Sequence, residues 1–371
     1  MKIHGSNRMA LAGALILLGA ALAAAQNPSI VNGSVQKRAA ASGLGAEFGT
    51  LVKAQTTPAW IGYGVPAVNG AYEACCNGGD HDGSVRFCGQ CRLEDGNYSS
   101  NISSESRTAN LETPDLLVLF RVENGAVEKI RMFSEDCELD AGGRTVYWLT
   151  GVSPQESVAL LASMVTGTTG SGGGLENSED ADRVSDGALA AIAMHAAPEA
   201  DAALKRFVTP EQPEKLRERA AFWMASARGK TGFETIRSLA RDDRDDRFRE
   251  KLMFDLSVSK QPEGVDALID SAHHDPSAPV RGQAIFWLAQ KAGKRAEGVI
   301  TEAIERDPNT EVKKKAVFAL SQLPKDEGVP LLIEAARSNS NPVVRKDAMF
   351  WLGQSNDPRA LEFFEQVLGQ R

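Results

Sequence analysis

The side chains best suited to chemistry in this chain are its five cysteines and a histidine that lies among them. Cys75 and Cys76 are adjacent, Cys88 and Cys91 are separated by two residues, and His81 lies between the two pairs. Thiolates and imidazole are zinc ligands, but two adjacent cysteines cannot easily chelate one ion, so a zinc site is the weaker interpretation. A thiol-redox role for Cys88 and Cys91 would need a thiolate at the start of a helix.

An apparent export signal favours disulfide bonds over a metal site or a redox role for these cysteines. Lys2 and Arg8 precede an apolar or small run over residues 9–25 that ends in three alanines, which is typical of a signal peptide cleaved before Gln26. The run is also close to the length of an uncleaved membrane anchor, which stays the alternative. Exported cysteines form disulfides by default, although five cysteines leave one thiol over and the pairing open. The predicted disulfide candidates are Cys75, Cys76, Cys88, Cys91 and Cys137.

The second half of the chain is dominated by a repeat of 32 residues, the interval from Phe222 to Phe254. Leucine and methionine recur with that period, and a second, offset apolar series marks another helix in each unit. Each unit is therefore expected to be a pair of helices. The most regular series is aromatic and consists of Phe222, Phe254, Phe286, Phe318 and Phe350.

These units carry the pattern Asp-Pro-x-x-x-Val-Arg-x-x-Ala-x-x-x-Leu, as in the run that begins at Asp275. The pattern resembles HEAT repeats, in particular the short repeats of phycobilisome-lyase-like proteins. The resemblance covers residues 184–371 and implies an α-solenoid, an architecture used mostly to hold other proteins. It departs from the usual pattern at Lys313 and Asn339.

Each repeated arginine or lysine has a polar residue six positions before it. The resemblance implies that such residues form a structural ladder, which ties the turn of one unit to the second helix of its own unit or the next. A bidentate carboxylate–guanidinium pair would fix orientation as well as add stability. A row of arginines that binds anions is the alternative. The ladder comprises Asp243, Arg249, Asp275, Arg281, Asp307, Lys313, Asn339 and Arg345, preceded by Glu211 and Arg217.

The phenylalanine series is expected to face outward. On a helical wheel, Phe286 lies almost opposite the arc formed by Val280, Ala284 and Leu288. Glutamines follow four residues after three of the phenylalanines, on the same face. Stacked units would align both rows along the concave surface, similar to the Trp-x-x-x-Asn ladders of armadillo arrays, which hold extended peptides. The glutamines are Gln290, Gln322 and Gln354.

Two other interpretations of the aromatic residues remain open. The Phe rings could pack between neighbouring helices and merely tighten the stack, in which case they would be buried in every repeat. Trp223, Trp287 and Trp351 recur in every second unit, with Asp255 and Ala319 in the units between them. We interpret these tryptophans as core packing at a boundary position.

The first half shows strand patterns instead. Residues 116–122 and 127–133 flank an Asn-Gly turn, which predicts a β-hairpin, and residues 153–165 are typical of a helix. We expect a small β-rich domain over residues 44–165, a Gly/Ser-rich linker over 166–183 and the solenoid over 184–371. The predicted fold class is α+β.

The composition fits a folded protein with a net charge of −8 and no polybasic region for nucleic acid. No nucleophile elbow, zinc-protease motif or phosphate-binding glycine loop occurs, so we predict no catalytic residues and no cofactor. We expect an exported, monomeric, periplasmic or secreted scaffold that binds a protein or extended peptide, without an integral membrane partner. The alternative is a thiol-redox or metal-dependent enzyme with its site at the cysteines, to which the repeats recruit substrate.

Overall fold

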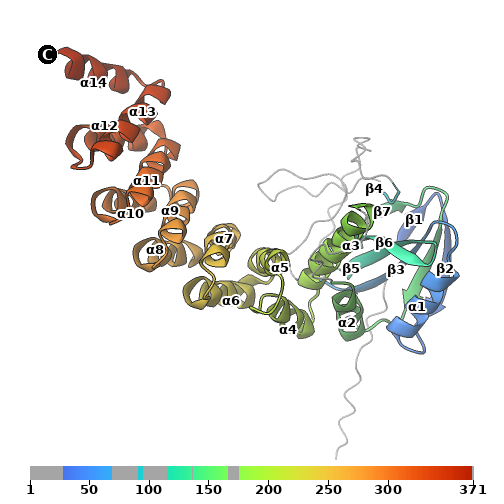
Figure 1. The fold of residues 1–371 in the computed structure, drawn as a ribbon. Coiled ribbons are helices and arrows are strands. Elements are labelled where there is room, and N and C mark those ends of the chain that lie inside the picture. The colour runs from blue at the N-terminus through green and yellow to red at the C-terminus, as the bar shows by residue number, and fades with distance from the viewer. Residues whose placement is uncertain (1–27, 69–90, 95–114, 136, 166–174, 370–371) are drawn as a thin grey trace, which may run out of the picture.

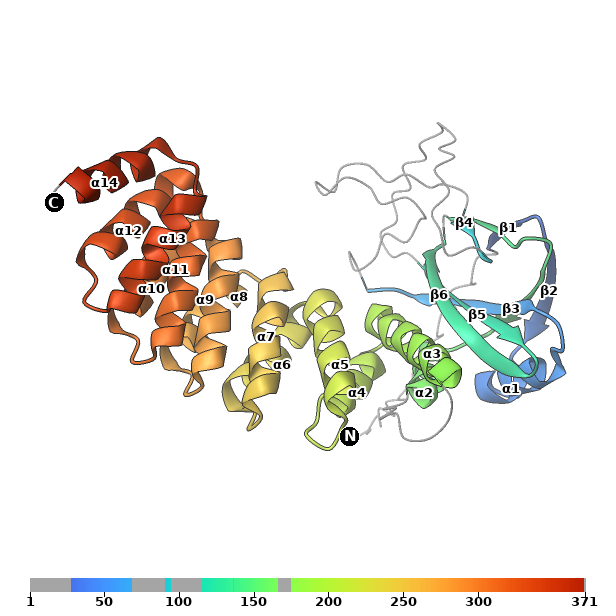
Figure 2. The same ribbon diagram turned by 45° about the horizontal axis from the view of Figure 1, so that its top comes forward.

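The computed structural model describes residues 28–68, 91–94, 115–135, 137–165 and 175–369. A region with two β-sheets comes first, and a curved row of stacked helices extends away from it to the C-terminus (Figures 1 and 2). The predicted α+β class with a helical solenoid is therefore confirmed.

The larger sheet has five strands, and the predicted hairpin forms one edge of it. Asn124 and Gly125 both have positive φ, of 50° and 75°, which is the backbone that a tight hairpin turn requires. The strand order is β2 (Ser34–Ala39), β8 (Thr145–Thr150), β3 (Ala59–Pro66), β5 (Asp115–Glu123) and β6 (Ala126–Ser134). A smaller sheet pairs β1 (Ser29–Val31), β7 (Glu138–Asp140) and β4 (Cys91–Arg92).

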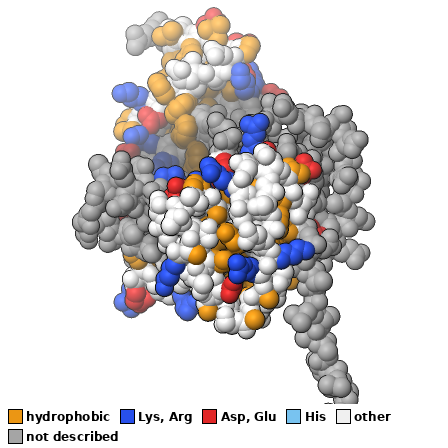
Figure 3. Space-filling model, turned by 90° about the vertical axis from the view of Figure 1, so that its right-hand side faces the viewer, with side chains coloured by type: hydrophobic (Ala, Val, Ile, Leu, Met, Phe, Trp, Pro, Cys, Tyr) orange, Lys and Arg blue, Asp and Glu red, His pale blue; other side chains and the backbone are white. Residues whose placement is uncertain are grey.

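Both faces of the larger sheet are covered. One face packs against α1 (Leu44–Ala54), α2 (Pro154–Met164) and α3 (Leu175–Met194), and the other buries a second cluster around Trp60 and Trp148. At the start of α2, Ser153 and Glu156 form the capping box that its Ser-Pro sequence favours. On the outer side of this region, basic and acidic side chains are interspersed (Figure 3).

The structure differs from the expected domain boundaries at two places. The sheets also include residues 29–39, before the expected start at residue 44, because β2 pairs in parallel with β8. Helix α3 begins at Leu175, inside the expected linker of residues 166–183. Because α3 packs on the sheet as well as on α5, it joins the two parts of the chain.

Helix pairs make up the second part, and each repeat contributes one pair. The phenylalanine-bearing helices are α5 (Glu214–Ala227), α7 (Asp246–Val258), α9 (Ala278–Ala292), α11 (Thr310–Gln322) and α13 (Pro342–Gln354). Each is followed by its partner, α6 (Gly229–Asp242), α8 (Gly264–His274), α10 (Lys294–Arg306), α12 (Lys325–Ser338) or α14 (Pro358–Gly369). Helix α4 (Pro198–Phe207) precedes them.

Glycine lets two of these pairs approach closely. A Cβ atom at Gly232 would lie 2.0 Å from the carbonyl oxygen of Met224, and one at Gly328 would lie 2.2 Å from that of Leu320. No side chain fits at such a distance, so the start of α6 and of α12 can rest directly on the preceding helix.

Buried ion pairs join successive units. The guanidinium of Arg249 donates two hydrogen bonds to the Asp275 carboxylate, of 2.9 and 3.0 Å, and Arg281 does the same to Asp307, at 2.8 and 3.0 Å. Arg217 also pairs with Asp243. Each pair therefore spans from the first helix of one unit to the turn before the next unit.

The residue six positions earlier has a different role from the one suggested by its spacing. Asp243 and Asp275 accept hydrogen bonds from Arg249 and Arg281 through their backbone oxygens, at 2.7 and 2.9 Å. The array changes toward its C-terminus: Lys313 donates to the backbone oxygen of Glu305, and Arg345 donates to that of Asn339. An arginine row committed to these partners has little capacity left for anions.

A buried polar cluster lies where the sheet meets the helices. His195 and Ser157 are fully buried, and Nε2 of His195 lies 2.7 Å from the Ser157 hydroxyl, which also contacts the Tyr63 hydroxyl at 2.8 Å. Nδ1 of His195 lies 2.6 Å from the Ala191 carbonyl oxygen and must donate to it, so Nε2 accepts from Ser157. Burial, together with the charge of Arg228, lowers the pKa of His195 to about 4.

Removing Arg281 should destabilise the array more than removing the whole ion pair. The change Arg281→Met leaves the Asp307 carboxylate, whose side chain is 6% exposed, without its partner, and should cost about 3 kcal/mol. In Arg281→Met with Asp307→Asn, no unpaired charge remains, and Asn339 shows that asparagine keeps the turn contact to the residue two positions on. Urea unfolding should therefore give a higher free energy of unfolding for the double variant than for the single variant. Equal stability of the two variants would contradict the assigned partner.

Acid should weaken the junction between sheet and helices through His195. Its pKa is about 4 in the folded protein and 6.5 in the unfolded chain, so the unfolded chain binds the extra proton first as pH falls. Stability should be unaffected above pH 6.5 and fall by up to about 3 kcal/mol on reaching pH 4. Thermal unfolding of the wild type and of His195→Phe over this pH range isolates the contribution of His195. If the stability of both proteins fell equally with pH, His195 would not be the cause.

Candidate functional site

The five repeated phenylalanines and three tryptophans form one continuous row of eight rings, which we call the aromatic row. Phe222 and Phe254 are parallel, with centroids 6.1 Å apart, and Phe286 and Phe318 repeat this arrangement at 6.0 Å. Tryptophans link the stacked pairs. In order, the row is Trp223, Phe222, Phe254, Trp287, Phe286, Phe318, Trp351 and Phe350, with neighbouring centroids 4.8–6.1 Å apart.

None of these phenylalanines is buried. Phe254 is 37% exposed and Phe350 56%, and the other three are half-buried. The tryptophans are half-buried too: they pack against the core, as their boundary position predicted, and they also belong to the row. Rings that stack on one another and still meet solvent on one side offer a ready apolar surface.

The predicted glutamines Gln290, Gln322 and Gln354 are exposed. Gln322 and Gln354 line a hollow of about 260 Å³ that also includes Trp351 of the aromatic row. The large groove along the row is lined by residues about one helical turn before the phenylalanines. Sequence reasoning missed Gln283 among them, although the repeat register places it with Arg219 and Lys251.

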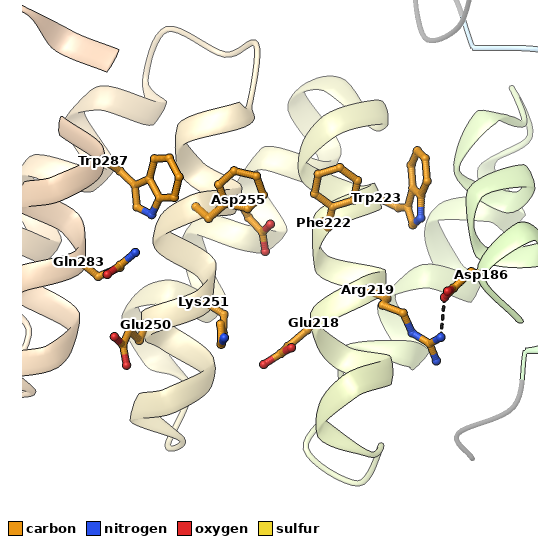
Figure 4. Close-up of a pocket in the computed structure, with 11 residues that line it drawn as sticks. Asp186, Glu218, Arg219, Phe222, Trp223, Glu250, Lys251, Asp255, Gln283 and Trp287 are labelled. Atoms are coloured by element: carbon orange, nitrogen blue, oxygen red, sulfur yellow. Dashed lines mark hydrogen bonds and ion pairs between the residues drawn. The ribbon is translucent and has the colours of Figure 1, made fainter. Parts of the chain in front are cut away.

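This groove has a volume of about 820 Å³ and crosses the first four odd-numbered helices of the array, α3, α5, α7 and α9 (Figure 4). Rings form one part of its wall and charged side chains the other. The lining residues are Asp186, Glu218, Arg219, Phe222, Trp223, Glu250, Lys251, Phe254, Asp255, Gln283 and Trp287.

Asp255 is the most unusual group in the groove. It is 4% exposed, and no hydrogen bond or ion pair is recorded for its carboxyl within the described residues. Burial raises its pKa to about 8, and the nearby charge of Glu218 adds to the shift. At neutral pH this buried acid is therefore mostly protonated, which is the expected response of a carboxyl group without a positive partner.

The indole nitrogen of Trp287 also lacks a partner within the described residues, whereas the other charged groups differ in this respect. Nε1 of Trp287 is buried without a hydrogen-bond acceptor among the described residues. The Arg219 guanidinium is paired with Asp186, and the nearest recorded cation to Glu250 is Lys315, at 4.0 Å. The lining contains no hydroxyl, thiol or imidazole group from the described part of the chain.

The cysteine cluster is mostly outside the described residues. Cys75, Cys76, His81 and Cys88 are not described, so the disulfides remain a prediction. Cys91 lies in β4, which pairs in parallel with β7, and Cys137 is buried just before β7. Where the chain is described, no three His, Cys, Asp or Glu side chains are grouped as a metal site.

The expected signal over residues 1–25 also lies outside the described residues. Among the helices that the structure describes, none combines the length and the hydropathy needed to cross a membrane.

A comparison with protein families agrees with the repeat architecture: a model for HEAT repeats matches residues 296–371. Solved structures with some likeness to the chain include human deoxyhypusine hydroxylase in complex with glycerol, which shares 17% identity over 54% of this chain and 76% of its own, with a TM-score of 0.29. The CpcE–CpcF complex of phycocyanin lyase from Nostoc sp. PCC7120 shares 21% identity over 40% of this chain and 98% of its own, with a TM-score of 0.32.

A third solved structure, of the Escherichia coli protein YibA, shares 17% identity over 58% of this chain and 77% of its own, with a TM-score of 0.34. No curated protein sequence matches the chain. The family match lies within the array, and the same spacing of repeated residues continues from it toward the N-terminus. The C-terminal part of the chain therefore consists of HEAT repeats.

Proposed function

We propose that this chain is an exported binding scaffold, whose HEAT array holds an extended segment of another protein along the aromatic row. The observation that carries the proposal is the row itself: eight rings in unbroken contact, of which the phenylalanines are all partly open to solvent. Exposed aromatic side chains in one continuous strip are typical of surfaces that bind proteins.

The form of the row favours an extended ligand over a compact one. A phenylalanine recurs once in every unit, so the row follows the axis of the array and offers similar contacts in successive units. A polypeptide in an extended conformation also has side chains at regular intervals, and can place apolar ones on successive rings. HEAT arrays suit this use because their stacked repeats provide long continuous surfaces.

Removing two adjacent rings should weaken binding strongly. Phe286→Ser with Phe318→Ser removes one stacked pair, and each ring at the centre of an interface contributes roughly 1–2 kcal/mol. Short peptides selected by display on the immobilised full chain should therefore bind the double variant at least ~30-fold more weakly. Fluorescence anisotropy of the labelled peptides measures this difference.

A matched control tests whether the row, rather than any exposed apolar residue, is responsible. Leu361→Ser changes a side chain that is 61% exposed on α14, outside the row, and should leave the affinity unchanged. Circular dichroism of each variant verifies that the array remains folded. If the selected peptides bound the double variant as tightly as the wild type, the proposal would be overturned.

Export is a separate part of the proposal and rests on residues 1–25 alone. When the full gene product is expressed in a bacterium with a periplasm, the protein recovered from that compartment should begin at Gln26. Intact-mass measurement distinguishes this product from one that retains the segment. Recovery of full-length chain from the cytoplasm only would contradict export and leave the aromatic row untouched.

A further inference from the structure

We propose that the groove across α5, α7 and α9 is a binding site for one basic side chain, lysine or arginine, of the segment held on the aromatic row. This inference rests on the proposed function and specifies the chemistry of its partner. The site combines an aromatic wall, a buried acid and an excess of carboxylates over cations.

The aromatic wall suits a cation. Phe222 and Phe254 lie parallel at 6.1 Å, and the ring of Trp287 lies 4.9 Å from that of Phe254, so several ring systems meet at one place. An ammonium or guanidinium group within about 6 Å of such a face is attracted by the negative potential of the ring, most strongly for tryptophan. The methylene stem of lysine or arginine would cover the apolar part of the same wall.

The groove offers Asp255 no positive partner among the described residues. Its described lining has four carboxyl groups and two cations, of which Arg219 pairs with Asp186, and Lys315 outside the lining lies 4.0 Å from Glu250. In Figure 4 the carboxyl group of Asp255 points toward the part of the groove that contains Glu218. A ligand cation at this place would supply the positive charge that Asp255 lacks, and would allow it to ionise.

The unpartnered indole favours a polypeptide over a free amine as the source of the cation. Nε1 of Trp287 can only donate a hydrogen bond, and its described surroundings offer no acceptor. A cation has no acceptor to offer either, whereas the backbone of a peptide carries a carbonyl oxygen at every residue.

A second copy of the aromatic wall lies two units further along the array, with different charges. Phe286 and Phe318 stack as the first pair does, and Trp351 takes the place of Trp287. Ala319 replaces Asp255, however, and Lys314 replaces Glu250. The first site should therefore select cations, and the second should not.

The test uses N-acetyl-lysine methylamide and N-acetyl-arginine methylamide as probes, with N-acetyl-norleucine methylamide as the neutral equivalent. Binding to the full-length protein is followed by the indole N–H NMR signals of Trp223 and Trp287, assigned with Trp→Phe variants. We expect saturable shifts with lysine and arginine, and at least tenfold weaker binding of norleucine. Equal binding of norleucine would overturn the proposal.

Asp255→Asn should weaken lysine binding at least tenfold at pH 8. Asparagine has the shape of the protonated acid, so the fold should be retained, and circular dichroism checks this. Asp347→Asn removes one acid from the array outside the groove and should change nothing. Unchanged affinity in Asp255→Asn would overturn the role of the acid.

The pH dependence of lysine binding provides a second readout of the same variant. Affinity for lysine should rise between pH 6 and 8 in the wild type and stay flat in Asp255→Asn. The charged groups of the described lining around Asp255 are Glu218 and Arg219 on α5, Glu250 and Lys251 on α7 and Asp186 on α3, with Lys315 of α11 4.0 Å from Glu250. Helix α9 contributes only the uncharged Gln283 and Trp287 to this described lining. A wild-type affinity that did not change over this range would contradict the proposal.

Three further outcomes are informative. Spermidine that bound at least tenfold more tightly than the lysine probe would identify a free amine as the ligand, and would overturn the assignment to a polypeptide. The display-selected peptides could bind the Phe286→Ser, Phe318→Ser double variant more weakly while the lysine probe leaves the Trp287 signal unshifted. That result would support the scaffold function and contradict the cation site. Binding of the lysine probe without binding of any peptide would support the cation site and contradict the scaffold proposal.

Discussion

The buried arginine–aspartate pairs between units are the constraint on which the rest of the array depends. A bidentate pair such as Arg281 with Asp307 fixes both the distance and the rotation between one unit and the next turn. Where units repeat with that geometry, identical positions lie side by side, and rings such as Phe286 and Phe318 come to lie within 3° of parallel. The row as a whole follows from the stacking of the units, since it continues to Phe350 across the joint where Lys313 replaces the arginine.

Sequence reasoning succeeded where the signal was local or repeated. The helix pairs follow from the regular period of the apolar residues, and the half-buried position of Phe286 is compatible with its angle on the helix. The Asn124–Gly125 hairpin follows from turn chemistry alone. The partner of Arg281 could not be inferred in this way, because the Asp275 carboxylate is nearer in the sequence while that of Asp307 is nearer in space.

The parts that were missed depend on long-range contacts. β2 is exposed along its whole length, so its residues show no alternation, and only its pairing with β8, far along the sequence, makes it part of the sheet. The burial of Asp255 could not be predicted from the sequence of its own helix either, because residues of neighbouring units also line the groove around it. The recurrence of tryptophan in every second unit was the available signal, and its value was underestimated.

Asp255 has a cost in the unbound protein that the fold does not explain. A buried acid whose pKa is raised to about 8 must stay protonated at neutral pH, whereas the unfolded chain is free to ionise there, so this position opposes folding. At the equivalent position beside the stacked Phe286–Phe318 pair, the chain has Ala319, which has no ionisable group. Since the aromatic row forms with either residue, the acid is not needed to build it. A destabilising group that the architecture can omit is best explained by what it binds.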